Sequence, residues 1–194
     1  IQKFTEKPSQ QDIVSDTINA GVYIFDSPEI IKAIPENKEI SVEKEIFPLL
    51  IEQGQPLFGY IHYGYWLDIG TIESYKKANF DVLSGKFNPD YKQEINNTIQ
   101  NRLIKEGELA LGKNAYIGEN TTIKGNVIIG DECFIGQNCV LENTIILDHS
   151  AVKNNSTVVD SIIGRQVYIG ENTTINNTIL PDKSLIHSYA RLGL

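Results

Sequence analysis

The stretch LGKNAYIGENTTIKGNVIIGDECFIGQNCVL, residues 111–141, carries a branched apolar residue at every sixth position. These residues are Leu111, Ile117, Ile123, Ile129, Ile135 and Leu141. A period of six is neither the period of an α-helix nor that of one long strand, and it is typical of short strands that are stacked in series and separated by turns. The stretch therefore predicts a solenoid in which each coil buries its inward side chains on the next coil.

The pattern continues toward the end of the sequence in steps of five or six residues. Further inward residues are expected at Leu147, Val152, Val158, Ile163, Ile169, Ile175, Leu180, Ile186 and Leu192. Two positions before each inward residue stands a mostly small side chain, with Ile145 as the large exception. Cys133 and Cys139 occupy two of these small positions, so we expect them to be core residues and neither metal ligands nor a disulfide.

The composition of the 194 residues excludes several classes of function. The 17 Lys and Arg against 25 Asp and Glu argue against a nucleic-acid partner, because nucleic-acid binding needs a basic surface. The longest apolar run, residues 47–51, is much shorter than the roughly 18–20 residues that cross a membrane, and the first residues lack the apolar region of a signal peptide. With only two cysteines, we expect a cytoplasmic protein without a membrane partner.

Residues 1–85 lack the six-residue period and alternate between strand and helix patterns. We expect strands at Thr17–Asp26, Leu57–His62 and Tyr65–Asp68, and helices from Ser27 as N-cap to Ile34, at Ser41–Gln53 and at Thr71–Ser84. This alternation predicts an α/β layer structure. Residues 86–102 are polar and without periodicity, so we expect them to link this α/β part to the solenoid of residues 103–194.

Three polar stretches of the α/β part stand where a predicted strand meets a loop, which is where open α/β sheets bind ligands. In the first, the Glu6 carboxylate can accept hydrogen bonds from sugar hydroxyls and the Lys7 ammonium can pair with a phosphate, although both also fit a surface ion pair. In the second, Asn19 can bind a diol and Gly21 permits close approach of a ligand, or forms a bulge. In the third, Asp68 can hold a divalent cation or cap the following helix.

The motifs EKP (residues 6–8), INAG (18–21) and GYWLDIGT (64–71), in this order, resemble those of the sugar-nucleotide pyrophosphorylases, the nucleoside-diphosphate-sugar nucleotidyltransferases. The resemblance covers about residues 3–86 and is strongest to the mannose-1-phosphate guanylyltransferases, apart from Ile72 where many members have Pro. Residues 103–194 resemble the hexapeptide-repeat left-handed β-helix family. Together these resemblances imply part of a Rossmann-like nucleotidyltransferase domain followed by an all-β left-handed parallel β-helix.

The resemblance implies a role for each of these polar residues. Glu6 would bind the sugar hydroxyls, Lys7 the sugar phosphate, Asn19 and Gly21 would border the sugar, and Asp68 would bind Mg²⁺. In the implied reaction a sugar-1-phosphate attacks the α-phosphorus of a nucleoside triphosphate, pyrophosphate leaves and an NDP-sugar forms, while Mg²⁺ neutralises the phosphates. Mannose-1-phosphate and GTP are the preferred pair, and glucose-1-phosphate with UTP or dTTP fits the same motifs.

The sequence departs from this family more seriously in lacking the nucleotide-binding features: a Gly-rich phosphate-binding turn with Arg, a downstream Pro-Lys and another metal-binding Asp. It also contains no Met and begins with Ile1, so we expect the nucleotide-binding half to lie upstream and the 194 residues alone to be inactive. A second hypothesis is that the solenoid is an assembly or regulatory module that joins copies into a homo-oligomer. A third is a β-helix acyltransferase with His149 as base, against which a surface histidine is favoured.

Overall fold

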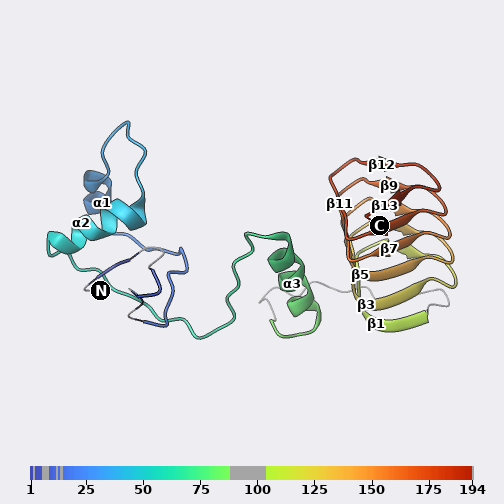
Figure 1. Cartoon of the computed structure of the whole chain (residues 1–194), viewed down its shortest axis with the longest axis horizontal. Coiled ribbons are helices and arrows are strands. Elements are labelled where there is room, and N and C mark those ends of the chain that lie inside the picture. Colours follow the sequence, from blue (N-terminus) through green and yellow to red (C-terminus); the bar gives the residue numbers. More distant parts are fainter. Residues whose placement is uncertain (2, 6–8, 12, 14, 88–103, 194) are drawn as a thin grey trace. The chain divides into compact units, whose positions relative to one another are not determined.

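The computed structural model describes residues 1–193 apart from residues 2, 6–8, 12, 14 and 88–103. Over these residues the chain forms two compact units, Ile1–Gly64 and Tyr65–Leu194 (Figure 1). The first unit contains three short helical segments, and the second contains helix α3 and all the strands. The unit boundary therefore falls inside residues 1–85 and assigns α3 to the same unit as the strands.

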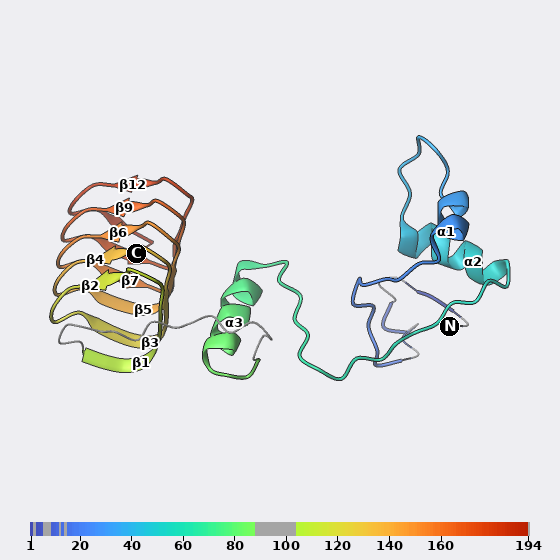
Figure 2. The same cartoon turned by 180° about the vertical axis from the view of Figure 1, so that it is seen from behind.

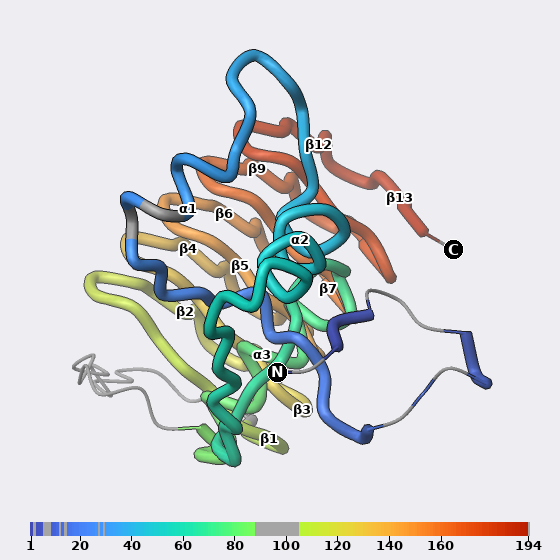
Figure 3. The backbone as a smooth tube through the Cα atoms, turned by 90° about the vertical axis from the view of Figure 1, so that its left-hand side faces the viewer, coloured from blue at the N-terminus to red at the C-terminus, as the bar shows by residue number. Residues whose placement is uncertain are grey.

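The strands of the second unit pair in parallel and stack in three columns, which makes a parallel β-helix (Figures 1 and 2). The first column contains β1 (Ile104–Leu111), β3 (Thr122–Ile129), β5 (Val140–Ile146), β7 (Thr157–Val159), β10 (Thr174–Asn176) and β13 (Arg191–Leu192). The second column contains β2 (Tyr116–Ile117), β4 (Phe134–Ile135), β6 (Ala151–Val152), β9 (Tyr168–Ile169) and β12 (Leu185–Ile186), which follow one another along the solenoid in Figure 3. The third contains the C-terminal ends of β1, β3 and β5, followed by β8 (Ile162–Ile163) and β11 (Ile179–Leu180). The parallel solenoid predicted from the six-residue period is confirmed, and its left-handed coiling stays a prediction.

The coils of the β-helix have two lengths. Strand partners in the first column are 18 residues apart in the first two coils and 17 residues apart in the next three, as the pairs Ile104↔Thr122, Thr122↔Val140, Val140↔Thr157, Thr157↔Thr174 and Thr174↔Arg191 show. A coil of 18 residues is three steps of six, and a coil of 17 contains one step of five. The mixture of steps in the sequence is therefore a mixture of two coil lengths.

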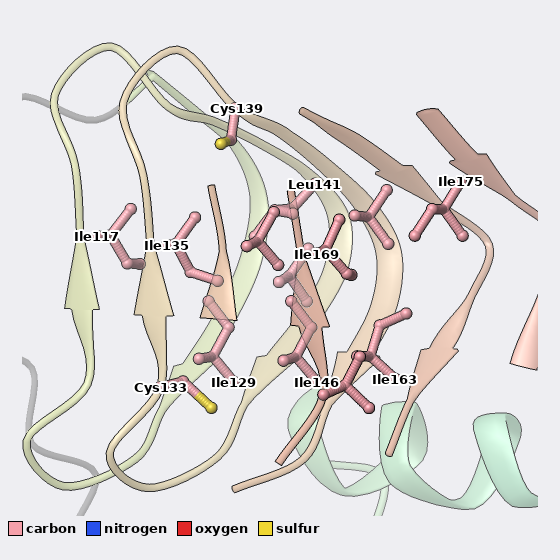
Figure 4. Packing of buried hydrophobic residues seen from close by; sticks show 14 of the residues in the cluster. Ile117, Ile129, Cys133, Ile135, Cys139, Leu141, Ile146, Ile163, Ile169 and Ile175 are labelled. Atoms are coloured by element: carbon pink, nitrogen blue, oxygen red, sulfur yellow. The ribbon is translucent and has the colours of Figure 1, made fainter. Parts of the chain in front are cut away.

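The inward side chains of all three columns form one continuous core (Figure 4). The most deeply buried members include Ile123, Ile129, Ile135, Leu141, Ile146, Val152, Val158, Ile163, Ile169 and Ile175. Cys133 and Cys139 are free and buried in the same cluster, as predicted. Each thiol donates a hydrogen bond of 3.2 Å to a backbone carbonyl of the next coil, as the Ser150 hydroxyl does at 2.7 Å. The cysteines therefore serve as small core residues.

The predicted inward position of Leu147 is wrong, because Ile146 points into the core there and Leu147 is only half-buried. The cause is a register shift between β3 and β5. Lys124 and Val127 are three residues apart on β3, whereas their partners Glu142 and Thr144 are two residues apart on β5. The residue is lost at the corner before the strand end, so Thr144 takes the small inward position and Ile146 the large one.

The β-helix turns at three corners, and each corner is a column of residues with a left-handed backbone. The first corner contains Asn114, Glu132, His149, Gln166 and Lys183, the second Asn120, Asn138, Asn155, Asn172 and Tyr189, and the third Asn143, Asp160 and Asn177, all with φ between 43° and 65°. Asn and Asp tolerate this conformation better than other residues with a side chain. The recurring Asn of the sequence therefore marks the second and third corners, whereas the first corner has Asn only at Asn114.

Helix α3 (Ile72–Leu83) begins and ends with strong local signals. Thr71 is its N-cap and forms a capping box with Ser74, in which each side chain accepts a hydrogen bond from the backbone N–H of the other residue. Ser84 is the C-cap, and Gly85 follows with φ of 75°. This confirms the helix predicted at Thr71–Ser84.

Helix α3 lies against the third column of the β-helix (Figure 4). The Lys76 ammonium donates a hydrogen bond of 3.0 Å to the backbone carbonyl of Asp160, at the third corner. Ile145 and Ile162 point outward from this column, since they alternate with inward residues, yet Ile145 is 1% exposed and Ile162 is 8% exposed. Ile179, one coil further in the same ladder, is 46% exposed. We infer that α3 covers the first two isoleucines and ends before the third.

The first unit contains α1 (Ser27–Ala33), the five-residue π-helical turn η1 (Val42–Ile46) and α2 (Phe47–Glu52). Asp26, and not Ser27 as predicted, is the N-cap of α1. The helix predicted at Ser41–Gln53 is confirmed as one continuous helical stretch between the caps Ser41 and Gln53, with a π-helical first part (η1) and an α-helical second part (α2). Among the described residues, no helix has the length and apolar character that crossing a membrane requires.

The segments Thr17–Asp26, Leu57–His62 and Tyr65–Asp68 contain no strand, so these three predictions are wrong for the structure described. A strand is defined by a hydrogen-bonded neighbour, and none of these segments forms a strand ladder among the described residues. Their apolar side chains are correspondingly uncovered, and Ile24 is fully exposed. The order of the apolar residues in these segments predicts strands, but a strand also needs a neighbouring segment to pair with, and the described residues provide none.

Candidate functional site

Asn19 and Gly21 lie together in the first unit. The backbone N–H of Gly21 donates to the Asn19 side-chain oxygen at 3.1 Å, and Gly21 has φ of 70°. A Cβ at Gly21 would have no neighbour within 4 Å, so the space beside this backbone is open. The positive φ explains the glycine, and the open space is compatible with close approach of a ligand.

Sequence reasoning missed two residues that join Asn19 in one hydrogen-bonded chain. The Asn19 amide donates to the Tyr23 hydroxyl at 2.5 Å, and that hydroxyl donates to the Glu43 carboxylate at 2.9 Å. Glu43 follows the N-cap Ser41, and hydrogen bonds from its own backbone N–H and from Tyr23 lower the pKa of its carboxyl. An acidic residue in the first helical turn is an ordinary helix-stabilising feature, so the pattern SVEKEIFP gave no separate signal for a site.

Glu6 and Lys7 lie outside the described residues. Two residues earlier, the Phe4 ring packs edge-on against Phe47 at the start of α2, with 5.1 Å between ring centroids. The Tyr23 ring packs on Phe47 at the same distance. The chain leading to the EKP motif and the chain following INAG therefore share one aromatic cluster around Phe47.

Asp68 lies in the second unit, immediately before helix α3. Its side-chain oxygen accepts a hydrogen bond of 3.1 Å from the backbone N–H of Gly70, and it does not cap the helix, because Thr71 does. The helix-cap alternative for Asp68 is therefore wrong. The carboxylate is exposed at the start of α3, which leaves the divalent-cation alternative open.

The described residues could provide only part of a binding site for a divalent cation. They contain no group of three or more His, Cys, Asp or Glu residues arranged to hold a metal. Mg²⁺ is often held by one or two carboxylates together with substrate phosphates, so one exposed aspartate is compatible with half of such a site. Asp68 is the residue that would hold the ion, and a further ligand would come from outside the described residues.

A buried carboxylate at the far end of α3 was not predicted. Asp81 is 4% exposed and accepts hydrogen bonds from the Tyr65 hydroxyl at 3.0 Å, from the Lys86 ammonium at 3.0 Å and from the Lys77 ammonium. Hydrogen bonds from Lys77 and then Lys86 lower the pKa of Asp81 to about 2. The i, i+4 spacing of Lys77 and Asp81 was the signal in the sequence, but such pairs are common on exposed helix surfaces.

The outer surface of the second column of the β-helix carries aromatic side chains. The Tyr116 and Phe134 rings stack with 5.3 Å between centroids, and the Lys153 ammonium lies 4.6 Å from the Phe134 centroid and 5.6 Å from that of Tyr168. Beside the first two rings is an open groove of about 320 Å³, lined also by Gly136, Gln137 and Asn154. The side chains that line this groove include no Ser, Thr, Cys, His, Lys, Asp or Glu.

His149 stands on the first corner of the β-helix, where its ring nitrogen lies 3.2 Å from the Glu132 carboxylate. Its side chain is about half exposed. The groove beside Tyr116 and Phe134 does not include it. These contacts correspond to the surface histidine that the sequence favoured, and none of them supports the acyltransferase hypothesis.

Two family models match the chain, one for each part. Residues 1–85 match the model described as nucleotidyl transferase, and residues 105–192 match the model described as GMPPB C-terminal domain. The second match covers the β-helix almost from its first strand to its last. The two models therefore describe the two parts that the sequence distinguished.

The relatives found are sugar-phosphate nucleotidyltransferases. Mannose-1-phosphate guanylyltransferase of Mycobacterium tuberculosis is 40% identical over 83 residues, which are 42% of this chain and 22% of that protein. Glucose-1-phosphate adenylyltransferase of Desulfitobacterium hafniense is 39% identical over 88 residues, 43% of this chain and 22% of that protein. Mannose-1-phosphate guanylyltransferase catalytic subunit beta of Drosophila pseudoobscura is 45% identical over 75 residues, 39% of this chain and 19% of that protein.

The chain thus spans about a fifth of the length of these relatives. All three similarities fall on proteins that transfer a nucleotide to a sugar phosphate, as their names state. The chain thus combines a region similar to the nucleotidyl transferase family, residues 1–85, with a region similar to the GMPPB C-terminal domains, residues 105–192.

Proposed function

We propose that the chain is the sugar-phosphate-binding part, with its β-helix tail, of an enzyme that joins mannose-1-phosphate to GTP and releases pyrophosphate. The observation that carries the proposal is the succession of a nucleotidyl transferase match and a GMPPB-type tail on one chain. The match of the tail to GMPPB C-terminal domains favours mannose-1-phosphate and GTP over other pairs of sugar phosphate and nucleotide. Transfer of uridylyl or thymidylyl groups to glucose-1-phosphate is the alternative, because relatives named for glucose-1-phosphate, one of them a uridylyltransferase, are 38% and 39% identical to this chain over 84 and 88 residues.

In the proposed reaction the chain's own residues bind and orient the sugar-1-phosphate. Lys7 holds its phosphate and Glu6 its hydroxyls, while Asn19 and the backbone at Gly21 border the sugar ring. Tyr23 and Glu43 keep the Asn19 side chain in place through the hydrogen bonds of 2.5 and 2.9 Å. Holding the attacking phosphate in line with the α-phosphorus is the main catalytic contribution that a protein makes to such a transfer.

Asp68 is the proposed ligand of Mg²⁺. When bound, the ion supplies charge neutralisation for the phosphates of the nucleoside triphosphate. The exposed carboxylate at the start of α3 supports this role, and the hydrogen bond from the Gly70 N–H fixes its orientation.

The experiment uses the full-length protein and measures pyrophosphate release with mannose-1-phosphate and GTP, and with glucose-1-phosphate and UTP or dTTP. We expect the first pair to react faster and Asp68→Asn to abolish the reaction. Glu119→Gln, an exposed carboxylate on the β-helix, is the matched control and is expected to leave the rate unchanged. Full activity of the Asp68→Asn protein would contradict the metal assignment, and faster reaction of a glucose-1-phosphate pair would contradict the substrate assignment.

We also propose that the β-helix joins copies of the protein into a homo-oligomer in the cytoplasm. The exposed aromatic surface around Phe134 and Tyr168 favours this second role, since exposed aromatic side chains are enriched at protein interfaces.

A further inference from the structure

The segment Tyr65–Asp68, which carries the candidate metal ligand, is held at both of its ends by helix α3. At the Asp68 end, the Gly70 N–H binds the carboxylate and the Thr71 capping box begins the helix. At the Tyr65 end, the phenol hydroxyl donates to Asp81 at 3.0 Å, sixteen residues along the chain. Both attachments belong to the second unit, which begins at Tyr65.

Asp81 is the one charged residue that is buried among the described parts of the chain. A buried carboxylate needs compensating charge, and the Lys77 and Lys86 ammonium groups provide it. The hydrogen bond from Tyr65 is therefore not required for neutralisation. Of the three donors to Asp81, only Tyr65 belongs to the segment that carries Asp68, so this hydrogen bond links the segment to α3.

The Tyr65 side chain is fixed by two kinds of contact. Its hydroxyl binds Asp81, and its ring stacks on Phe87 beyond the end of α3, with 4.9 Å between centroids and 19° between ring planes. A ring that is held by its face and by its hydroxyl has little freedom to move. The backbone of Tyr65 is thus anchored three residues before Asp68.

From this geometry we infer that Asp81 is a positioning residue, which acts through Tyr65 to fix the backbone that presents Asp68. The inference rests on the function proposed above for Asp68. The bond between Tyr65 and Asp81 anchors one end of the segment and the capping box anchors the other, so the carboxylate keeps one position relative to α3.

Trp66 makes this testable without any enzyme assay, because it is the only tryptophan of the chain and lies next to Tyr65. Tyr65→Phe removes the hydroxyl and keeps the ring that stacks on Phe87. We expect this substitution and Asp81→Asn each to increase acrylamide quenching of Trp66 fluorescence. Tyr63→Phe, a matched change at a 91% exposed tyrosine, should leave quenching unchanged. Unchanged quenching in both test proteins would overturn the inference.

The second measurement separates positioning from plain structural support. In the full-length enzyme we expect Tyr65→Phe to raise the Mg²⁺ concentration for half-maximal rate by about ten- to a hundred-fold, the equivalent of one hydrogen bond to a charged group, with KM for the sugar phosphate unchanged. Thermal unfolding of the β-helix, followed by circular dichroism, should stay as in the wild type. An unchanged Mg²⁺ dependence together with increased quenching would reduce Asp81 to a structural role and overturn the positioning inference.

The two proposals fail in different ways. If Asp68→Asn keeps full activity, the metal assignment is wrong, whatever Trp66 reports. If Asp68→Asn is inactive and the Tyr65→Phe protein shows neither increased quenching nor altered Mg²⁺ dependence, the function stands and the role of Asp81 is wrong.

Discussion

The charge of Asp81 makes the attachment of Tyr65 dependent on pH. Its carboxylate accepts hydrogen bonds from Tyr65, Lys77 and Lys86, which are the titratable groups that contact it. The pKa falls from 3.8 to about 2, mainly because of the two lysines. Since the folded-state pKa is below the ordinary value, the ionised carboxylate stabilises the fold above about pH 4, and this contribution is lost as the pH falls toward about 2.

We therefore expect acrylamide quenching of Trp66 to rise as the pH is lowered from about 4 to about 2, where Asp81 takes up a proton. In the Asp81→Asn protein, quenching should be high and should not change over this range. Circular dichroism recorded on the same samples checks that the β-helix remains folded. A wild-type protein whose Trp66 quenching stays constant while the β-helix is intact would contradict the prediction.

Ile146 and its neighbour Leu147 test the register of the shortened coil. Ile146 is completely buried in the core and Leu147 is half-buried on the outside. Ile146→Ala is expected to lower the free energy of unfolding by about 2–5 kcal/mol, because it leaves a cavity in a packed core. Leu147→Ala is expected to cost about 1 kcal/mol. Chemical denaturation measures both, and a larger loss for Leu147→Ala would restore the register predicted from the sequence.

At the scale of single elements, the inferred cover of α3 over one apolar ladder of the β-helix can be tested. Ile145 and Ile179 belong to this ladder, and Ile145 is 1% exposed whereas Ile179 is 46% exposed. We expect Ile145→Asp to expose the backbone of α3, since an unpaired charge would then be buried between the helix and the sheet. Hydrogen exchange of the α3 amides should become faster by a factor of about ten or more. Ile179→Asp, at the exposed end of the same ladder, is the control and should leave α3 protection unchanged.

The elements differ in how far the sequence determines them. Helix α3 was predicted almost to the residue, because Thr71 is a local start signal and Gly85 a local stop signal, and neither needs a partner segment. The core of the β-helix was predicted because each inward residue meets its equivalent in the next coil. Ile146 was missed because the lost residue lies at a corner, where apolar periodicity gives no information. The segment Thr17–Asp26 was predicted as a strand from its residues alone, but pairing is a property of two segments.

The same distinction applies to the candidate site. Asn19, Gly21 and Asp68 are predicted site residues because their motifs stand where predicted strands meet loops. Glu43 and Asp81 were missed, since each reaches its partner across 16 to 20 residues and looks in the sequence like an ordinary helical charge. Sequence reasoning therefore proposed residues at which a ligand could bind, and it overlooked the residues that are hydrogen-bonded to the segments carrying them.

At the scale of the whole molecule, the aromatic surface of the β-helix predicts association of copies. Phe134→Lys combined with Tyr168→Lys introduces charges where two apolar faces would meet, so we expect the mass measured by light scattering to fall from that of an oligomer to that of a monomer. Ile179→Lys, an exposed residue of the third column, is the control. If the mass of the double variant equals that of the wild type, this surface does not mediate assembly.

The change from 18-residue to 17-residue coils has a consequence for the dimensions of the tail. Neighbouring strands are separated by about 4.8 Å whatever the number of residues in the coil, so the five steps from β1 to β13 give about 24 Å in either case. A corner can lose one residue without altering this length, whereas a whole coil added or removed would change it by about 4.8 Å. The length of the tail is thus set by its number of coils and is insensitive to single-residue deletions at its corners.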